Sequence, residues 1–225
     1  MADAEMNKSA PDALMLLGTH CPHCPVVLGS LADLVKQGVI SKLEVVNLEQ
    51  RPETGRELGV RSVPWVRIGP FEFSGLHSKA ELQSWAEQAG SEQGITKYFE
   101  QLLGEGEVKH VLEMIGKDHA LLHALIGLVS DADAKINARV GAGVIMEDYE
   151  GKTELLALIP ELGKLTRHED ARVRSDACHY LSLTHDVSVR EYIEPLLRDD
   201  HEEVREVAEE SLATIEESLA FNDAS

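Results

Sequence analysis

The chain has 225 residues and three cysteines, and it is 43% hydrophobic, 27% charged and only 4% aromatic. This composition is typical of an ordinary soluble globular protein, and three cysteines cannot supply a disulfide framework. The net charge of −19 is uneven, because residues 1–91 carry −3 and residues 92–225 carry −16. The acidic second part excludes nucleic acid and anionic membrane surfaces as partners, since phosphate contacts need Lys and Arg.

No apolar run approaches the length of a membrane span, and residues 1–11 lack the apolar core of a signal peptide. We therefore expect a cytoplasmic protein, unless a leader has been trimmed. The break in charge predicts a domain boundary near residue 91. We expect an N-terminal tail at 1–10, a first domain at 11–90, a helical domain at 91–221 and a C-terminal tail at 222–225.

The first domain alternates between strand-like and helix-like segments. A crossover helix between the first two strands makes them parallel, whereas the tight turn at Gly69 and Pro70 makes the last two antiparallel. Ser78 and Glu81 predict a capping box at the start of the last helix. The order is βαβαββα, with strands at 13–17, 43–48, 65–68 and 71–73 and helices at 24–37, 52–58 and 78–89.

The second domain has helical periodicity throughout residues 94–221, and three of its segments resemble one another. Each copy begins with acidic residues, continues with an apolar residue and then enters a helix that contains Ala or Cys. Aligning Ile136, Val173 and Val204 gives spacings of 37 and 31 residues. An apolar helix is expected before each copy, at 121–129, 155–165 and 189–197, and residues 95–116 are expected to form a degenerate leading hairpin.

This pattern indicates a stack of helical hairpins. One hairpin cannot bury its own apolar face, so its neighbours complete the core. The small residues Ala142, Ala177 and Ala208 would permit close contact between helices. Across about residues 118–220 the chain resembles short HEAT-like repeats. The resemblance implies an all-α repeat domain, and we expect it to dock a protein partner.

Cys21 and Cys24 lie where the first strand has ended and the first helix begins. A helix N-terminus presents free N–H groups and a partial positive charge, and both stabilise a thiolate at Cys21. Cys24, three residues further on, is placed to resolve a mixed disulfide. Pro22 restricts the loop between them, and His23 adds a donor close to the reactive sulfur. We expect a Cys21–Cys24 pair that cycles between dithiol and disulfide.

The motif and its surroundings resemble the thioredoxin family, in particular the small thioredoxin/glutaredoxin-like domains with a Cys-Pro-His/Tyr-Cys-Pro motif. In that family a proline with a cis peptide bond faces the dithiol, and Val63–Pro64 stands in this place. The resemblance implies an α/β thioredoxin-like domain in which Val63 and Pro64 shape a substrate groove. Trp65 follows directly, and it either gates the substrate or packs as an apolar strand residue.

One position departs from the family pattern. The thioredoxin type carries a buried acid six residues before the first cysteine, and this chain has Met15 there. The internal proton acceptor is therefore missing or supplied elsewhere, which disfavours strong reductase activity of the standard kind. A Cys-x-x-Cys motif can also be half of a zinc site, but a structural zinc ion needs four ligands and there is no second Cys pair. We expect no metal and no cofactor.

Other reactive residue types have simpler interpretations. Cys178 is interpreted as a small buried core residue, with a third redox partner for Cys21 as the alternative. His119 and His123 stand four residues apart and could ligate a metal, but a third ligand is not evident, and a packed or solvated pair is preferred. The acidic runs at 199–200, 202–203 and 209–210 are interpreted as solvated helix faces and turns.

The sequence predicts a thiol–disulfide oxidoreductase that acts on protein or peptide disulfides. Cys21 attacks or is attacked, Cys24 resolves, and His23 tunes the potential. The helical repeats would hold a protein partner with a basic face near the dithiol, although the acidic charge could instead serve only solubility. The second hypothesis is a redox-sensing scaffold, in which the repeats are the main function and the dithiol regulates docking.

Overall fold

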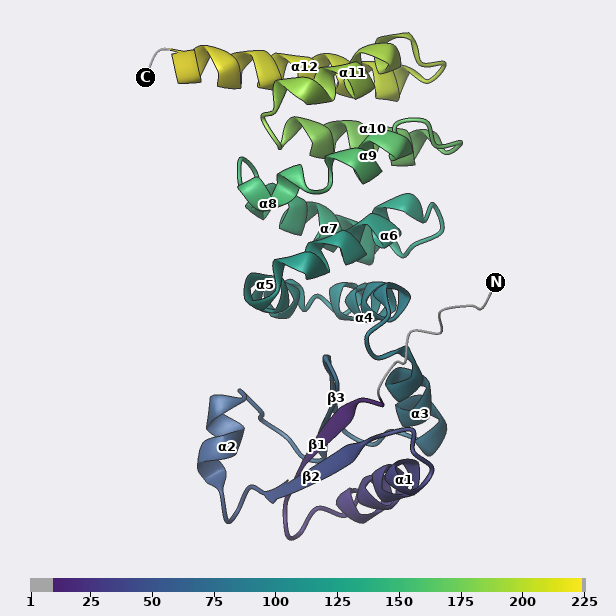
Figure 1. Ribbon diagram of the computed structural model, residues 1–225, viewed down its shortest axis with the longest axis vertical. Helices are drawn as coiled ribbons and strands as arrows, with labels where there is room; N and C mark the ends of the chain where they lie inside the picture. The colour runs from purple at the N-terminus through teal and green to yellow at the C-terminus, as the bar shows by residue number, and fades with distance from the viewer. Residues whose placement is uncertain (1–9, 224–225) are drawn as a thin grey trace, which may run out of the picture. The chain divides into compact units, whose positions relative to one another are not determined.

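The computed structural model describes residues 10–223 (Figure 1). The chain divides into two compact units, Met1–Ile95 and Thr96–Ser225. Of the predicted tails, residues 1–9 and 224–225 lie outside the described residues. The boundaries of the domains predicted at 11–90 and 91–221 stay predictions.

The first unit contains a four-stranded mixed sheet in the order β2-β1-β3-β4. Strand β1 is parallel to β2 and antiparallel to β3, and β3 is antiparallel to β4. The predicted element order and strand directions are confirmed, and every predicted bound agrees within one residue. The elements are β1 (Asp12–Leu17), α1 (Cys24–Lys36), β2 (Lys42–Asn47), α2 (Pro52–Glu57), β3 (Trp65–Ile68), β4 (Phe71–Ser74) and α3 (Lys79–Gln88).

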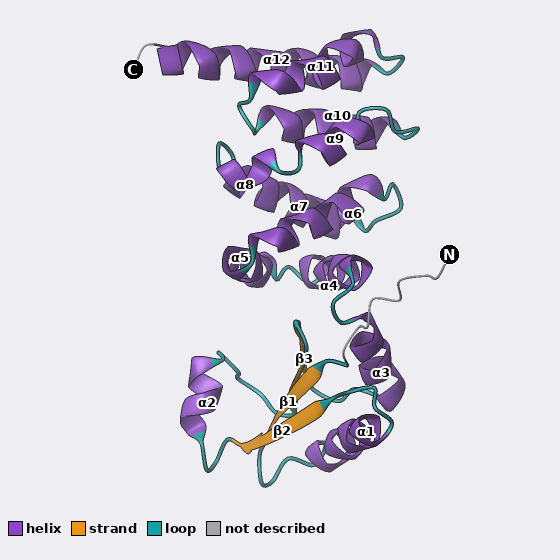
Figure 2. Ribbon diagram, in the orientation of Figure 1, coloured by secondary structure: helices purple, strands orange, loops and turns teal. Residues whose placement is uncertain are grey.

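The core of this unit lies between the sheet and the pair α1 and α3, which pack beside each other (Figure 2). Alternate strand residues point to this side, as the two-residue period of a strand requires. Among them Met15 and Val66 are fully buried against Leu31 of α1 and Leu82 of α3. The core therefore fixes the start of α1 against the end of β1.

The predicted capping box at the start of α3 is confirmed. The Glu81 backbone N–H donates to Ser78 Oγ at 3.3 Å, and the Ser78 backbone N–H donates to Glu81 Oε2 at 2.8 Å. The hydrogen bonds that Ser78 donates to the carboxylate, from its backbone N–H and from its hydroxyl, lower the pKa of Glu81. Two N–H groups that the helix leaves without partners are thus satisfied by side chains.

The second unit consists of helices that follow one another in pairs (Figure 2). The expected leading hairpin is present as α4 and α5, and α4 contains the point at which the two units divide. No helix within residues 10–223 has both the length and the apolar character needed to cross a membrane. The helices are α4 (Glu92–Gly104), α5 (Val108–Lys117), α6 (Ala124–Ser130), α7 (Ile136–Asp148), α8 (Thr153–Leu156), α9 (Ile159–Leu165), α10 (Ala171–Ser182), α11 (Arg190–Ile193) and α12 (Glu202–Asp223).

The first helix of each later hairpin is shorter than predicted. The segment predicted as one helix at 155–165 is divided into α8 and α9, and Pro160 lies in the first turn of α9. The segment at 189–197 is divided between α11 and a 3₁₀ turn that contains Pro195. A proline has no N–H to donate and its ring clashes with the preceding turn, so an α-helix does not continue through it unbroken.

The predicted alignment of the first repeat is wrong by two residues. Ile136 is 77% exposed, whereas Ala138 is fully buried, as Val173 and Val204 are. Ala138 is therefore the residue equivalent to Val173, and the spacing between the first two copies is 35 residues rather than 37. The correct alignment also places Arg139 directly after the buried residue, as in the later copies. Ile136 is the more hydrophobic residue, so the sequence pattern places it at the buried position, which in this copy holds the small Ala138.

Arginine–aspartate pairs join consecutive repeats. Arg174 of α10 donates from Nε and Nη2 to the two carboxylate oxygens of Asp199, at 2.7 Å each. Arg139 of α7 donates from Nη2 to a single carboxylate oxygen of Asp176 of α10. The Asp199 side chain is only 9% exposed, so its interpretation as part of a solvated acidic turn is wrong. The hydrogen bonds from Arg174 lower the pKa of Asp199 to about 2.

Replacing Asp199 by asparagine should destabilise the protein by about 2 kcal/mol at pH 7, because it removes the charge that pairs with buried Arg174. The folded-state pKa is below the unfolded value, so this stabilisation is present above about pH 4 and is lost as the pH falls towards 2. Urea unfolding at pH 7, 4 and 2.5 measures the difference. Asp200→Asn is the control, because Asp200 is exposed. Equal effects of both substitutions at pH 7 would contradict the assignment.

Candidate redox site

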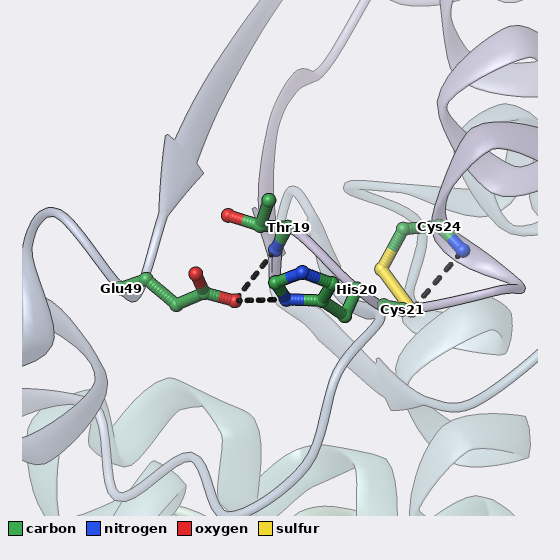
Figure 3. Close-up of a disulfide and its surroundings, with 5 residues drawn as sticks. All are labelled: Thr19, His20, Cys21, Cys24 and Glu49. Carbon is green, nitrogen blue, oxygen red and sulfur yellow. Dashed lines mark hydrogen bonds and ion pairs between the residues drawn. A yellow bond between two sulfur atoms is a disulfide. The ribbon is translucent and has the colours of Figure 1, made fainter.

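The two cysteines of the motif lie at the junction between β1 and α1 (Figure 3). Cys21 belongs to the connecting loop, and Cys24 is the first residue of the helix. Their Cα atoms are 5.5 Å apart, and the two sulfur atoms form a disulfide. Pro22 and His23 are exposed between them, and His23 occupies the N-cap position without a capping hydrogen bond from its side chain. The predicted pairing of Cys21 with Cys24 is thus present in the structure.

The start of α1 directs a backbone donor at one of the two sulfurs. The Cys24 N–H donates to Cys21 Sγ at 3.2 Å. The next residue, Pro25, has no N–H and cannot donate to the sulfur. The N–H of Cys24 makes this contact. An N–H group at a helix N-terminus carries partial positive charge and stabilises a thiolate. This geometry favours negative charge on Cys21.

The two cysteines differ in accessibility. Cys24 is 3% exposed and belongs to the buried cluster that also contains Met15 and Val27. Cys21 is half-buried and packs against the edge of that cluster. A reagent in solution can therefore approach Cys21, whereas Cys24 is shielded.

The loop before β3 lies against the motif loop. The Val63–Pro64 peptide bond is cis, as predicted. Val63 lies close to Gly18 of the motif loop, because a Cβ atom placed on Gly18 would be only 3.4 Å from a methyl group of Val63. The carbonyl of Gly18 in turn accepts a hydrogen bond from the Cys21 N–H at 3.3 Å. Pro64 is buried, and its carbonyl accepts from the Gly75 N–H at 2.8 Å. The structure thus brings Val63 and Pro64 to the same end of the sheet as the cysteines.

Trp65 occupies a less accessible position. It is 5% exposed, pairs with Leu16 across the sheet and has the Arg67 guanidinium 5.9 Å from its ring centre. This burial favours the interpretation of Trp65 as a packed strand residue, and its contribution to substrate binding stays a prediction.

A polar network beside the motif was not predicted from the sequence (Figure 3). The Thr19 N–H donates to Glu49 Oε1 at 2.8 Å, and Asn47 Nδ2 donates to Thr19 Oγ1 at 3.1 Å. The hydrogen bonds from Thr19 lower the pKa of Glu49, and His20 Nδ1 lies 3.8 Å from the same carboxylate oxygen. The signal that could have found the network is the parallel pairing of β1 with β2, which brings the residues after both strands to one edge.

The comparisons with known proteins agree with this geometry. The family model of the thioredoxin domain matches residues 13–87, and that of HEAT repeats matches residues 121–213. The chain combines a thioredoxin-like domain with HEAT repeats. No curated protein matches it. The resemblances inferred from the motif and from the repeat pattern are confirmed.

The thioredoxin-like domain has a thioether where its relatives of the thioredoxin type have an acid. Met15 is fully buried in the cluster that contains Cys24. A carboxyl group is therefore not present at that place to accept a proton from the buried cysteine. The carboxylate of Glu49 lies on the outside of the motif loop and is tied to Thr19.

The remaining candidates lie in the second unit. Cys178 is fully buried and hydrogen-bonded to Ser211, and burial raises the pKa of its thiol to about 11, which supports the interpretation as a core residue. His119 and His123 pair with two different glutamates, Glu154 at 3.2 Å and Glu161 at 3.3 Å. Within residues 10–223 no group of three or more metal-ligating side chains comes together.

Alkylation of the reduced protein should distinguish the three cysteines. We expect Cys21 to react at least about ten times faster with iodoacetamide at pH 7 than Cys24, because Cys21 is accessible and receives the helix N–H. Cys178 should react only after unfolding. Peptide mapping by mass spectrometry measures each rate, and the same reaction in denaturant is the control in which all three should be similar. Equal rates of Cys21 and Cys24 in the folded protein would remove the assignment.

Proposed function

We propose that the thioredoxin-like domain is a thiol–disulfide oxidoreductase that acts on protein or peptide disulfides. The observation that carries the proposal is the asymmetry of the dithiol. Cys21 is accessible and receives the N–H of Cys24 at 3.2 Å, whereas Cys24 is buried directly behind it. A nucleophile in front of a shielded resolving thiol is the arrangement that two-step disulfide exchange requires.

In the reducing direction the Cys21 thiolate attacks one sulfur of a substrate disulfide. That S–S bond breaks, one substrate sulfur leaves as a thiolate, and a mixed disulfide with Cys21 forms. The Cys24 thiolate then attacks the Cys21 sulfur, which releases the second substrate thiolate and forms the Cys21–Cys24 disulfide. Two electrons pass to the substrate, and the cysteine protons go to solvent or to the released thiolates. The oxidising direction is the reverse of these steps.

The residues around the dithiol have supporting roles in this proposal. Pro64 offers no N–H of its own, and its carbonyl is already bonded to Gly75, so we assign the pairing with an extended substrate to the backbone of Val63. His23 is exposed one residue before Cys24, and as a cation it would favour the thiolate and so make the disulfide a better oxidant. Pro22 limits the motion of the loop.

The HEAT repeats are proposed to dock a protein partner that the dithiol serves. Stacked helical hairpins offer an extended surface that suits a protein better than a small substrate. Residues 92–225 carry a net charge of −16, which favours a partner with a basic face. Holding the partner on the same chain raises its effective concentration at the dithiol. A cytoplasmic location, where thiols are kept reduced, is part of the proposal.

One observation favours a second candidate, a redox-sensing scaffold in which the dithiol regulates docking. Met15 fills the place of the acid that would accept a proton from Cys24. Slow deprotonation of Cys24 would suit a sensor better than an enzyme, because a sensor needs to respond only once whereas an enzyme must turn over repeatedly. The sensor should show a change in partner affinity on oxidation without catalysed exchange.

Two substitutions in the dithiol test turnover. Cys21→Ser should reduce the rate of disulfide-peptide reduction, with dithiothreitol as the electron donor, to the uncatalysed rate, because it removes the nucleophile. Cys24→Ser should also stop turnover but should accumulate a mixed disulfide between Cys21 and the peptide, visible by mass spectrometry. Cys178→Ser is the matched control and should keep the activity of the unmodified chain. A wild-type chain that does not exceed the uncatalysed rate would exclude the enzyme and leave the sensor.

A further inference from the structure

An exposed apolar row runs along α7 in the second unit. Ile136, Val140 and Val144 are spaced four residues apart, so they lie on one face of the helix. They are 77%, 62% and 46% exposed. Three large apolar side chains in one line are more than scattered surface residues, and such a patch marks an interaction site.

The row is a property of α7 and not of the repeat. In the alignment fixed by the buried residues, Val140 corresponds to Ser175 of α10 and Glu206 of α12. Val144 corresponds in the same way to His179 and Glu210. Because α10 and α12 form their hairpins with polar residues at these positions, the repeat does not need apolar side chains there. The same face is therefore apolar on α7 and acidic on α12. Along the stack, α7 lies before α10 and α12 lies after it (Figure 1).

A groove begins where the apolar row ends. Its volume is about 590 Å³, and it is lined by residues of α7, α10 and α12. Glu147, one turn beyond Val144 on the same face of α7, lies at its edge. The carboxylates that line the groove belong to Glu147, Glu150, Asp176 and Glu210, and the lining of the groove contains no Lys or Arg.

The charges around the groove leave it acidic. Asp176 is paired with Arg139, and Glu147 and Glu150 lie near the imidazoles of His179 and His185 at 3.7 and 2.9 Å. One arginine and two histidines thus face four carboxylates. A second copy of this chain would bring another acidic surface to the groove, and like charges would oppose that contact. The complementary occupant is cationic.

We propose that α7, α10 and α12 form the docking surface for an amphipathic, basic helix of the protein partner. This inference rests on the proposed docking function of the repeats and names the segment that they bind. Apolar residues of the segment, repeated every three or four positions, cover Ile136, Val140 and Val144. Lys or Arg residues about two turns further along the segment reach the groove at Glu147 and Glu210. Ile136 and Glu147 are 11 residues apart, so the surface spans about 16 Å along α7.

Binding of defined peptides to the full-length oxidised protein tests the proposal. Three labelled 16-residue peptides with helix-forming sequences are compared by fluorescence anisotropy. The first has an apolar face with a basic end, the second has the same apolar face with an acidic end, and the third has the basic end with the apolar face replaced by serine. The first should bind at least about ten times more tightly than either of the others, and added salt should weaken it. Equal binding of the first and third peptides would overturn the proposal.

Matched substitutions locate the surface. Val140→Ser and Glu210→Lys should each weaken the first peptide at least about tenfold. The controls change the same residue types outside the surface: Val187→Ser removes another exposed valine, and Glu209→Lys makes the same charge change on the adjacent side of α12. Both controls should stay within about twofold of the unsubstituted chain. Equal losses at Glu209 and Glu210, or full affinity of the Val140 variant, would contradict the assignment.

The same variants separate this proposal from the redox function. Val140 and Glu210 lie outside the dithiol, so reduction of a small disulfide peptide should proceed at the unsubstituted rate in both. Loss of peptide binding with unchanged turnover in the Val140 and Glu210 variants supports the docking surface. Absent turnover with intact, surface-dependent binding would overturn the enzyme and leave the docking surface standing. Thermal unfolding should show that these exposed substitutions leave both units folded.

Discussion

The proposed redox site depends on one contact, the hydrogen bond from the Cys24 N–H to the Cys21 sulfur at 3.2 Å. The contact exists because the core of the first unit holds the start of α1 against the end of β1, through Met15, Val27 and the sulfur of Cys24 itself. One cysteine therefore becomes part of the packed core, and the other is held in front of it with a partial positive charge directed at its sulfur. The difference in accessibility and the direction of the helix N–H follow from this junction, and the proposed order of reaction depends on both.

The second unit is held together by a different principle. Its helices are joined by buried small and aliphatic residues, and the pairs of Arg139 with Asp176 and Arg174 with Asp199 link one repeat to the next. Because these contacts fix the stack, the outward faces of its helices are free to vary. The apolar row on α7 and the glutamates at the equivalent positions of α12 show that variation. A thioredoxin-like domain with little net charge and strongly acidic HEAT repeats are thereby combined in one chain.

Local signals predicted most of the first unit. The pairing of Cys21 with Cys24 and the capping box at Ser78 each depend on residues close in sequence, and both were found where expected. The cis bond before Pro64 was expected from the resemblance to the thioredoxin family, and it is present. The network of Thr19, Asn47 and Glu49 could not be predicted in this way, because it joins loops about 30 residues apart. The register of the first repeat failed for a related reason. Burial is decided by packing, so the small Ala138 occupies the core while the more hydrophobic Ile136 is exposed.

We propose that the Cys21–Cys24 pair carries electrons and is not a structural cross-link. The reduction potential of this couple tests it most directly, measured by equilibrating the full-length protein in thiol–disulfide buffers and counting the modified cysteines by mass spectrometry. We expect a single two-electron transition between about −270 and −120 mV, the range of catalytic dithiols. A disulfide that stays oxidised below about −300 mV would identify a structural bond and exclude electron transfer by this pair.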